Sequence, residues 1–205
     1  MTTPVFDAEF WDRMYRHRPA EWDGEPNPLL AEVAAGLAPG TALDMGCGEG
    51  ADAVWLAQRG WQVMAVDLSQ VALERGRAAD PAQQVTWVQA DLHAWKPPAE
   101  AFDLVSAHFL HIPPAGRREF FDGLARAVRP NGTLLVVAHD ASDLETSIGR
   151  PPIPDLYFTA EEVAASLAPG RWEIRFGGTR SRETTDREGR PVTIQDMVLE
   201  ARRLS

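Results

Sequence analysis

Apolar and polar positions follow two different periods along the first two thirds of the chain. Short apolar runs typical of buried strands occupy 41–45, 61–66, 85–88, 102–107 and 133–138. Segments with apolar residues on one helical face lie at 52–59, 69–79 and 117–128, and Ser69 is a suitable N-cap for the second of them. Strands that alternate with helices at this spacing predict a parallel, doubly wound sheet.

The last third of the chain has a different order of elements. Thr159 and Glu162 form a capping-box pattern, which predicts a helix reaching to about residue 167. Two strand-like stretches, 172–176 and 192–201, then follow with only a turn between them. Strands without an intervening helix pair antiparallel. We therefore expect an α/β fold with a doubly wound, seven-stranded, mostly parallel sheet and an antiparallel last strand, in a single domain spanning 1–205.

Composition and charge narrow the range of partners. The chain has 20 basic and 30 acidic residues, a formal net charge of −10, and one cysteine. An acidic surface repels phosphate backbones, so nucleic acid is not an expected partner. The longest apolar run, 134–138, is far shorter than the ~20 residues of a membrane helix, so a membrane is not expected either. The single cysteine and the absence of an apolar segment near residue 1 favour a cytoplasmic protein, as a monomer or homodimer.

Glycines and carboxylates gather where three of the expected strands end. Asp44 precedes the glycine loop 46–50, Asp67 ends the second strand, and Asp91 follows the third. The carboxylate of Asp44 would repel a pyrophosphate and attract an ammonium or sulfonium group. Asp67 is placed to accept from both ribose hydroxyls, and Asp91 from an adenine amino group with Leu92 packing on the ring. The pattern favours a cationic adenosine ligand without phosphates, although the loop alone also fits a nicotinamide cofactor.

Four short stretches of the sequence resemble the motifs of one known family. Leu43-Asp-Met-Gly-Cys-Gly-Glu-Gly50, Val66-Asp67, Ala90-Asp91-Leu92 and Phe102-Asp-Leu-Val105 are similar to successive motifs of class I S-adenosylmethionine-dependent methyltransferases. The antiparallel ending also resembles that fold. The segments 10–15 and 22–28 most resemble the small bacterial group near the tellurite-resistance and thiopurine methyltransferases. The resemblance covers nearly the whole chain and implies S-adenosyl-L-methionine as the cofactor.

The resemblance also implies roles for individual residues. The loop glycines would line the methionine part of the cofactor, and Asp44 would lie near its ammonium group. Asp67 would hold the ribose with Leu68 against the adenine, and His108 would flank the methionine and the transferred methyl group. The expected cofactor-binding residues are Asp44, Gly46, Gly48, Gly50, Asp67, Leu68, Asp91, Leu92, His108 and Trp22.

The sequence gives less information about the residues that would bind the methyl acceptor. His111, just past the fourth strand, is the candidate general base for an acceptor that arrives protonated. Tyr15, Arg16 and His139 are candidate acceptor-binding residues, with 1–30 as a lid and the proline-rich loop 147–155 as the opposite wall. A small thiol, another chalcogen nucleophile or a hydroxyl compound fits the resemblance.

Two other functions are compatible with parts of the pattern. A non-catalytic S-adenosylmethionine-binding protein would carry the same carboxylates, because methyl transfer needs no obligatory catalytic side chain. A nicotinamide-dependent oxidoreductase would need a third glycine near position 51, where the sequence has Ala51, and a parallel sixth strand. No His/Asp/Glu cluster at metal-ligand spacing stands out, so no metal is expected.

Overall fold

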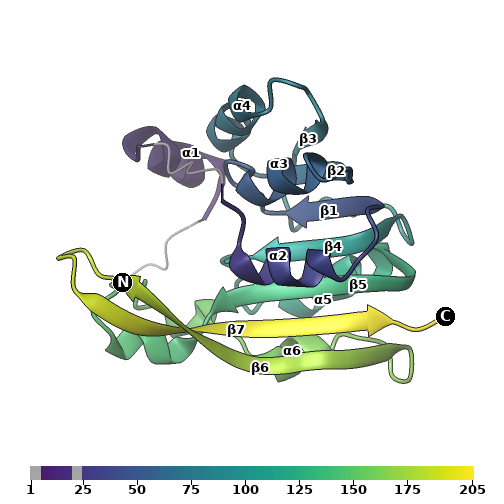
Figure 1. Cartoon of the computed structure of the whole chain (residues 1–205). Helices are drawn as coiled ribbons and strands as arrows, with labels where there is room; N and C mark the ends of the chain where they lie inside the picture. Colours follow the sequence, from purple (N-terminus) through teal and green to yellow (C-terminus); the bar gives the residue numbers. More distant parts are fainter. Residues whose placement is uncertain (1–5, 20–24) are drawn as a thin grey trace.

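One sheet organises the fold. The computed structural model describes residues 6–19 and 25–205, and its strand order is β3-β2-β1-β4-β5-β7-β6 (Figure 1). The strands are β1 (Thr41–Met45), β2 (Gln62–Asp67), β3 (Val85–Gln89), β4 (Phe102–His108), β5 (Val128–His139), β6 (Trp172–Thr185) and β7 (Pro191–Arg203). The pairs from β3 to β5 are parallel, and β7 is antiparallel to both β5 and β6. The predicted fold class is confirmed, and the parallel sixth strand of the nicotinamide alternative is absent from the described sheet.

Helices cover both faces of this sheet (Figure 1). They are α1 (Ala8–His17), α2 (Pro28–Ala35), α3 (Ala51–Ala57), α4 (Gln70–Ala79), α5 (Arg117–Ala127) and α6 (Ala160–Ala164), with short 3-10 helices η1 (Ala141–Glu145) and η2 (Pro154–Leu156). Along β5, Leu134 and Val136 belong to the apolar cluster that includes α5 and α6, whereas Leu135 and Val137 belong to the cluster that includes α2 and α3. Because both faces are buried, this strand has an uninterrupted apolar sequence.

The predicted caps form, and several element ends differ from the expectation. The Ser69 side chain accepts from the Ala72 N–H, and Thr159 and Glu162 make the full capping box. The helix after the capping box is nevertheless short and ends at Ala164. β6 continues to residue 185 because it pairs with β7 along its whole length, although its outer residues are polar.

Residues 130–132, whose sequence Pro-Asn-Gly is typical of a turn, are part of β5. This strand already pairs with β4 at Val128, and its register then shifts at a bulge that spans these residues. Asn131 adopts a left-handed φ of 68° within the bulge. The turn residues therefore bend the strand without ending it.

The carboxyl ends of the parallel strands meet at one edge, and α1 lies over this edge beside α4 (Figure 1). Between β3 and β4 the described chain forms no helix, and a loop of residues 90–101 connects the two strands. Within 6–19 and 25–205, no helix combines the length and apolar character needed to cross a membrane.

Candidate functional site

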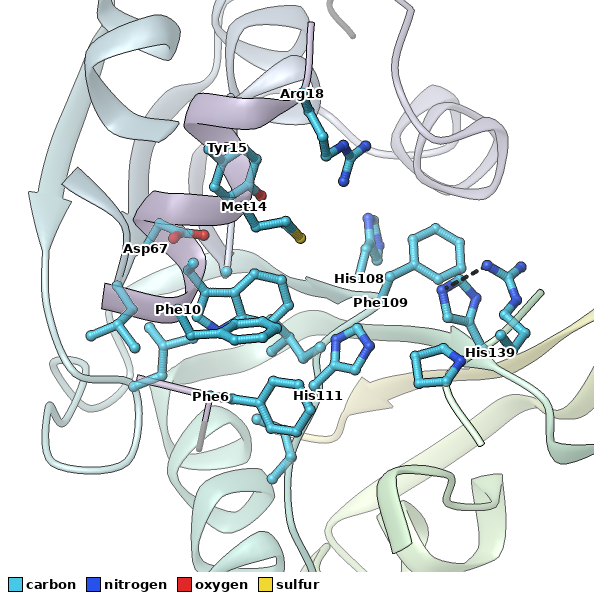
Figure 2. Close-up of a pocket in the computed structure, with 18 of the residues that line it drawn as sticks. Phe6, Phe10, Met14, Tyr15, Arg18, Asp67, His108, Phe109, His111 and His139 are labelled. Atoms are coloured by element: carbon cyan, nitrogen blue, oxygen red, sulfur yellow. Dashed lines mark hydrogen bonds between the residues drawn. The ribbon is translucent and has the colours of Figure 1, made fainter. Parts of the chain in front are cut away.

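A cavity of about 550 Å³ lies at the carboxyl edge of the sheet (Figure 2). In Figure 2, Asp67 and His139 lie at opposite ends of the cavity, with His108 and His111 between them. We call one part the Asp67 end, which comprises Gly46, Asp67, Leu68, Asp91 and Leu92. The other part, the His139 end, comprises Phe109, His111, His139, Arg187 and the loop residues 148–151. The predicted opposite wall, 147–155, therefore contributes residues to the cavity.

The glycine loop has a backbone conformation that residues with a side chain rarely adopt. Gly46 and Gly50 have φ values of 74° and 82°, in the left-handed region. A Cβ atom at Gly46 would overlap the Leu110 side chain, and one at Gly50 would overlap the Trp87 ring. Gly46 lines the cavity, whereas Gly48 and Gly50 lie behind its surface and shape the loop.

Asp67 anchors this loop to the start of α4. Its Oδ2 accepts from the Gly48 N–H and its Oδ1 accepts from the Ser69 N–H, both at 2.8 Å. Burial raises the pKa of Asp67, and the backbone donors offset only part of this rise. Each carboxylate oxygen has a further lone pair, so Asp67 can still accept from a ligand in the cavity. Asp91 accepts from the His93 N–H at 2.9 Å and lies at the same end.

Asp44 is buried behind the loop and does not line the cavity. Its Oδ1 accepts from the Ser106 hydroxyl at 3.3 Å, and its Oδ2 has no partner among the described residues. Burial and the neighbouring charge of Asp52 raise the pKa of Asp44 to about 7, against the opposing effect of His108. Asp44 therefore titrates close to neutral pH.

His108 forms an ion pair that sequence reasoning missed. Its Nδ1 lies 2.6 Å from Oδ2 of Asp52, and Oδ1 of Asp52 accepts from the Asn27 N–H at 2.6 Å. Burial opposes protonation of His108, but the hydrogen bond and charge of Asp52, together with the charge of Asp44, raise its pKa. The Nε2 atom is buried without a partner among the described residues. His108 can therefore present an N–H donor at the cavity wall. Asp52 lies in the first turn of α3, and no sequence spacing links it to a histidine after β4.

His111 and His139 have the opposite electrostatic character. Burial, followed by the charge of Arg150, lowers the pKa of His111, and its ring stacks on Phe6 with 5.6 Å between centroids. Burial, Arg150 and further positive neighbours lower the pKa of His139 to about 3. The ring of His139 stacks on Phe109 at 4.5 Å. Both histidines are neutral at neutral pH, so His111 has a lone pair available for a proton.

Helix α1 forms the roof of the cavity. Asp12 on α1 accepts from the Ser69 hydroxyl at 2.6 Å and from the Val71 N–H at 3.2 Å, which ties α1 to the start of α4. Tyr15, predicted to bind the acceptor, lines the cavity with its hydroxyl against Gly48 of the glycine loop, and burial and the charge of Asp67 raise its pKa. Arg16 does not line the cavity, because its guanidinium pairs with Asp12 at 3.4 Å on the exposed side of the helix.

Further lining residues of the N-terminal segment had only a weak sequence signal. The cavity is also lined there by Phe6, Phe10, Trp11, Met14 and Arg18. In the sequence, the aromatic residues of this segment stand among charged ones, and this pattern does not tell which side of the helix faces the cavity. Trp22, the expected cofactor contact, lies outside the described residues.

The sequence and fold have clear relatives. Residues 42–132 match a family described as "Methyltransferase domain". The chain is 28% identical over 166 residues to thiocyanate methyltransferase 1 of Arabidopsis thaliana, covering 77% of this chain and 71% of that protein. It is 30% identical over 149 residues to an uncharacterized methyltransferase of Mycobacterium bovis, covering 70% of this chain and 71% of that one. A structure from work on "Conversion of a Disulfide Bond into a Thioacetal Group during Echinomycin Biosynthesis" has a TM-score of 0.74 at 24% identity, covering 96% and 91%.

Proposed function

Because the chain belongs to the class I S-adenosylmethionine-dependent methyltransferases and transfers a methyl group to a small molecule, we propose that its acceptor is a thiol methylated on sulfur. The observation that carries this proposal is the chemistry of the His139 end. The carboxylates among the described lining residues, Asp67 and Asp91, both lie at the other end. The His139 end offers neutral histidines and the guanidinium of Arg150, which favour a nucleophile that is easily ionised.

The residues of the Asp67 end fit the cofactor. Gly46 brings its backbone to the cavity surface, and Asp67 keeps free lone pairs. In this proposal Gly46, Gly48 and Gly50 shape the methionine site, Asp67 and Leu68 hold the ribose and adenine, and Asp91 and Leu92 complete the adenine site. Asp44, buried behind the loop, would attract the ammonium group of the methionine part by its charge. The buried Nε2 of His108 supplies a hydrogen-bond donor on the methionine side. S-adenosylmethionine would supply a methyl group on a sulfonium, which the acceptor would take by in-line attack while the carbon–sulfur bond breaks and S-adenosylhomocysteine leaves as a neutral thioether.

His111 is the proposed general base. Its lowered pKa keeps the imidazole unprotonated, so it can take the proton of a thiol as the nucleophile forms. A thiol with a pKa near ~8.5 is already partly ionised at pH 8, whereas a phenol with a pKa near ~10 is not. The base should therefore matter far more for a phenol than for a thiol. The cavity would contribute most of the remaining rate enhancement by aligning the acceptor with the methyl group and by excluding water.

A matched pair of acceptors tests this proposal. Methyl transfer to thiophenol and to phenol is measured by product formation at pH 8, with the wild type and with His111→Ala. We expect kcat/KM for thiophenol to exceed that for phenol by about tenfold or more, since the thiol ionises more readily. His111→Ala should lower turnover of a phenol by ~10²–10⁴-fold and of thiophenol by less. Preference for phenol, or no product from thiophenol, would contradict the thiol proposal.

The lid and the cellular setting are also proposals. We infer that 1–30 acts as a lid within a single methyltransferase domain spanning 1–205, because α1 roofs the cavity and Asp12 ties it to α4. Tyr15, whose hydroxyl lies against Gly48, would contact the cofactor from this lid, and not the acceptor. The charge of −10 and the single cysteine support a cytoplasmic monomer or homodimer that does not bind nucleic acid.

A further inference from the structure

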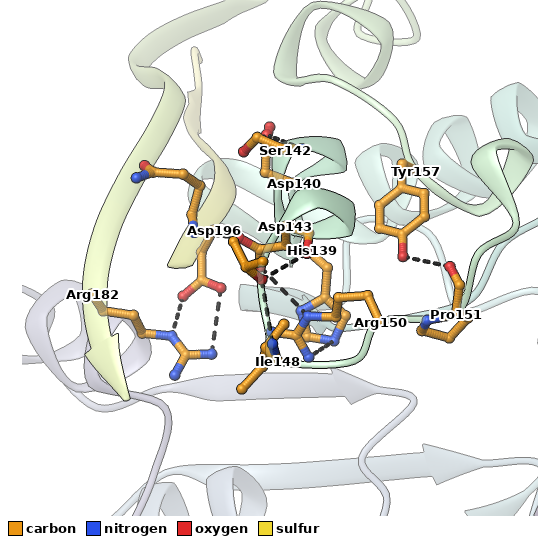
Figure 3. Close-up of polar contacts among 12 residues, drawn as sticks. His139, Asp140, Ser142, Asp143, Ile148, Arg150, Pro151, Tyr157, Arg182 and Asp196 are labelled. Carbon is orange, nitrogen blue, oxygen red and sulfur yellow. Dashed lines mark hydrogen bonds and ion pairs between the residues drawn. The ribbon is translucent and has the colours of Figure 1, made fainter. Parts of the chain in front are cut away.

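His139 and Arg150 form a hydrogen-bonded pair at the end of the cavity farthest from Asp67 (Figure 3). Nη1 of Arg150 lies 3.2 Å from Nε2 of His139, and Nε of Arg150 lies 3.4 Å from Oδ2 of Asp143. Asp143 is itself almost fully buried, and its Oδ1 accepts from the Gln195 N–H at 2.8 Å. The carboxylate of Asp143 therefore links Arg150 to the backbone of β7 and holds the pair in place.

The contact fixes which ring nitrogen of His139 carries the proton. A guanidinium is a donor only and stays protonated in proteins, so Nε2 of His139 must accept from Arg150. The ring then carries its proton on Nδ1. The pKa of His139, lowered first by burial and then by the charge of Arg150, agrees with a ring that stays neutral. Its Nδ1 is buried and has no partner among the described residues.

We propose that the Nδ1–H of His139 and the guanidinium of Arg150 bind an anionic group of the acceptor, such as a carboxylate, and that His139 is a positioning donor and not a base. This inference rests on the proposed function only in taking the acceptor to enter this cavity. Both residues line the cavity, and among the described residues Nη2 of Arg150 has no acceptor.

The surrounding charges favour an anion over a neutral group. Arg187, on the turn between β6 and β7, lines the same end and lies against Gly149. Arg182 adds positive charge near His139, although it is paired with Asp196 at 2.6 Å. A chain with a net charge of −10 thus presents guanidinium groups at this end and carboxylates at the other. An anionic group is attracted to such a site and is oriented by its fixed donors.

Binding calorimetry with benzoate and benzamide tests the proposal without methyl transfer. Both ligands are titrated into the protein saturated with S-adenosylhomocysteine. We expect benzoate to bind at least about tenfold more tightly, since hydrogen bonds to a charged group are stronger than those to a neutral one. Arg150→Met should remove this preference and leave benzamide binding unchanged, whereas Arg171→Met, which lies outside the cavity lining, should keep it. Equal binding of the two ligands, or binding of neither, would overturn the proposal.

Two further measurements separate a donor from a structural histidine. Nitrogen-15 NMR should show His139 protonated on Nδ1 alone and not titrating between pH 5 and 8, and Arg150→Met should raise the pKa of His139 by removing one of the charges that lower it. Asparagine can place an amide N–H near the Nδ1 position, so His139→Asn should keep part of the preference for benzoate that His139→Leu loses. Protonation on Nε2, or titration in the wild type, would contradict the assignment. If benzoate binds as expected but thiophenol is not methylated, the proposed function fails and the donor pair stands.

Discussion

The Asp67 end and the His139 end of the cavity are built in different ways. At the Asp67 end, the chain lines the cavity directly after β1, β2 and β3, so the lining residues lie close to strand ends in the sequence. At the His139 end, the groups come from the loop after β4, the end of β5, the loop around Arg150 and the turn at Arg187. The first end depends on local backbone geometry and the second on contacts between distant segments.

This difference determines what each end can tolerate. Backbone N–H groups and glycines hold the Asp67 end, so its geometry is sensitive to the addition of a single methyl group. Side chains hold the His139 end, so substitutions there should change which acceptor binds before they change the fold. Four predictions test how the Asp67 end and the helix that covers the cavity are held, in order of decreasing expected effect.

Gly50→Ala should have the largest effect. The new Cβ would overlap the Trp87 ring at a residue with φ of 82°, which combines a left-handed backbone cost of ~1–2 kcal/mol with an overpacking cost of ~1–3 kcal/mol. Gly170→Ala is the matched control, because φ there is 70° and nothing lies within 4 Å of the added Cβ. Urea denaturation should show a clearly larger loss for Gly50→Ala. Equal losses would mean that the loop can move away from Trp87.

Asp67→Ala should weaken cofactor binding at least about tenfold, because charge-assisted hydrogen bonds contribute ~1.5–3 kcal/mol each. The variant should also lower the free energy of unfolding, since Asp67 accepts from the Gly48 and Ser69 N–H groups in the protein itself. Calorimetry with S-adenosylhomocysteine and thermal denaturation measure the two effects. Unchanged affinity beside lower stability would show that Asp67 is only a structural anchor.

The pH dependence of stability should reveal the buried Asp44 and His108. The pKa of Asp44 is raised from its ordinary value of 3.8 to about 7, so the folded state binds the extra proton and loses stability as the pH rises through this window. The raised pKa of His108 acts in the same direction, because its stabilisation is present below pH 6.5 and lost as the pH passes its folded pKa. Asp44→Asn should flatten the decline between pH 4 and 7. An unchanged slope would exclude Asp44 as its source.

The sequence predicted the Asp67 end much better than the His139 end. Strand periodicity located β1, β2 and the loop glycines, and parallel strands bring their carboxyl ends to one edge whatever the side chains around them. Asp67, Asp91 and Leu92 therefore came together as expected. The roles of these residues remain predictions, because only their placement is established.

The rest of the site depends on contacts that no local pattern encodes. The pair of His108 with Asp52 joins residues 56 positions apart, and Arg150 reaches His139 across an irregular loop. The rotation of α1 about its axis decided that Arg16 pairs with Asp12 and that Arg18 lines the cavity. In the same way β6 is longer than expected because β7 pairs with it, not because its own side chains alternate.

The smallest predicted effect concerns the attachment of α1. Asp12→Ala removes two acceptor contacts, to the Ser69 hydroxyl and the Val71 N–H, at ~0.5–1.5 kcal/mol each. If α1 closes over the acceptor, the acceptor KM should rise about fivefold, since ~1 kcal/mol corresponds to about that factor. Arg16→Ala is the matched control, because it loses only the exposed ion pair with Asp12, and exposed pairs contribute ~0.2–1 kcal/mol. Steady-state kinetics with thiophenol compare the two variants. An equal response of both would show that the contact of Asp12 with α4 has no part in closing the cavity.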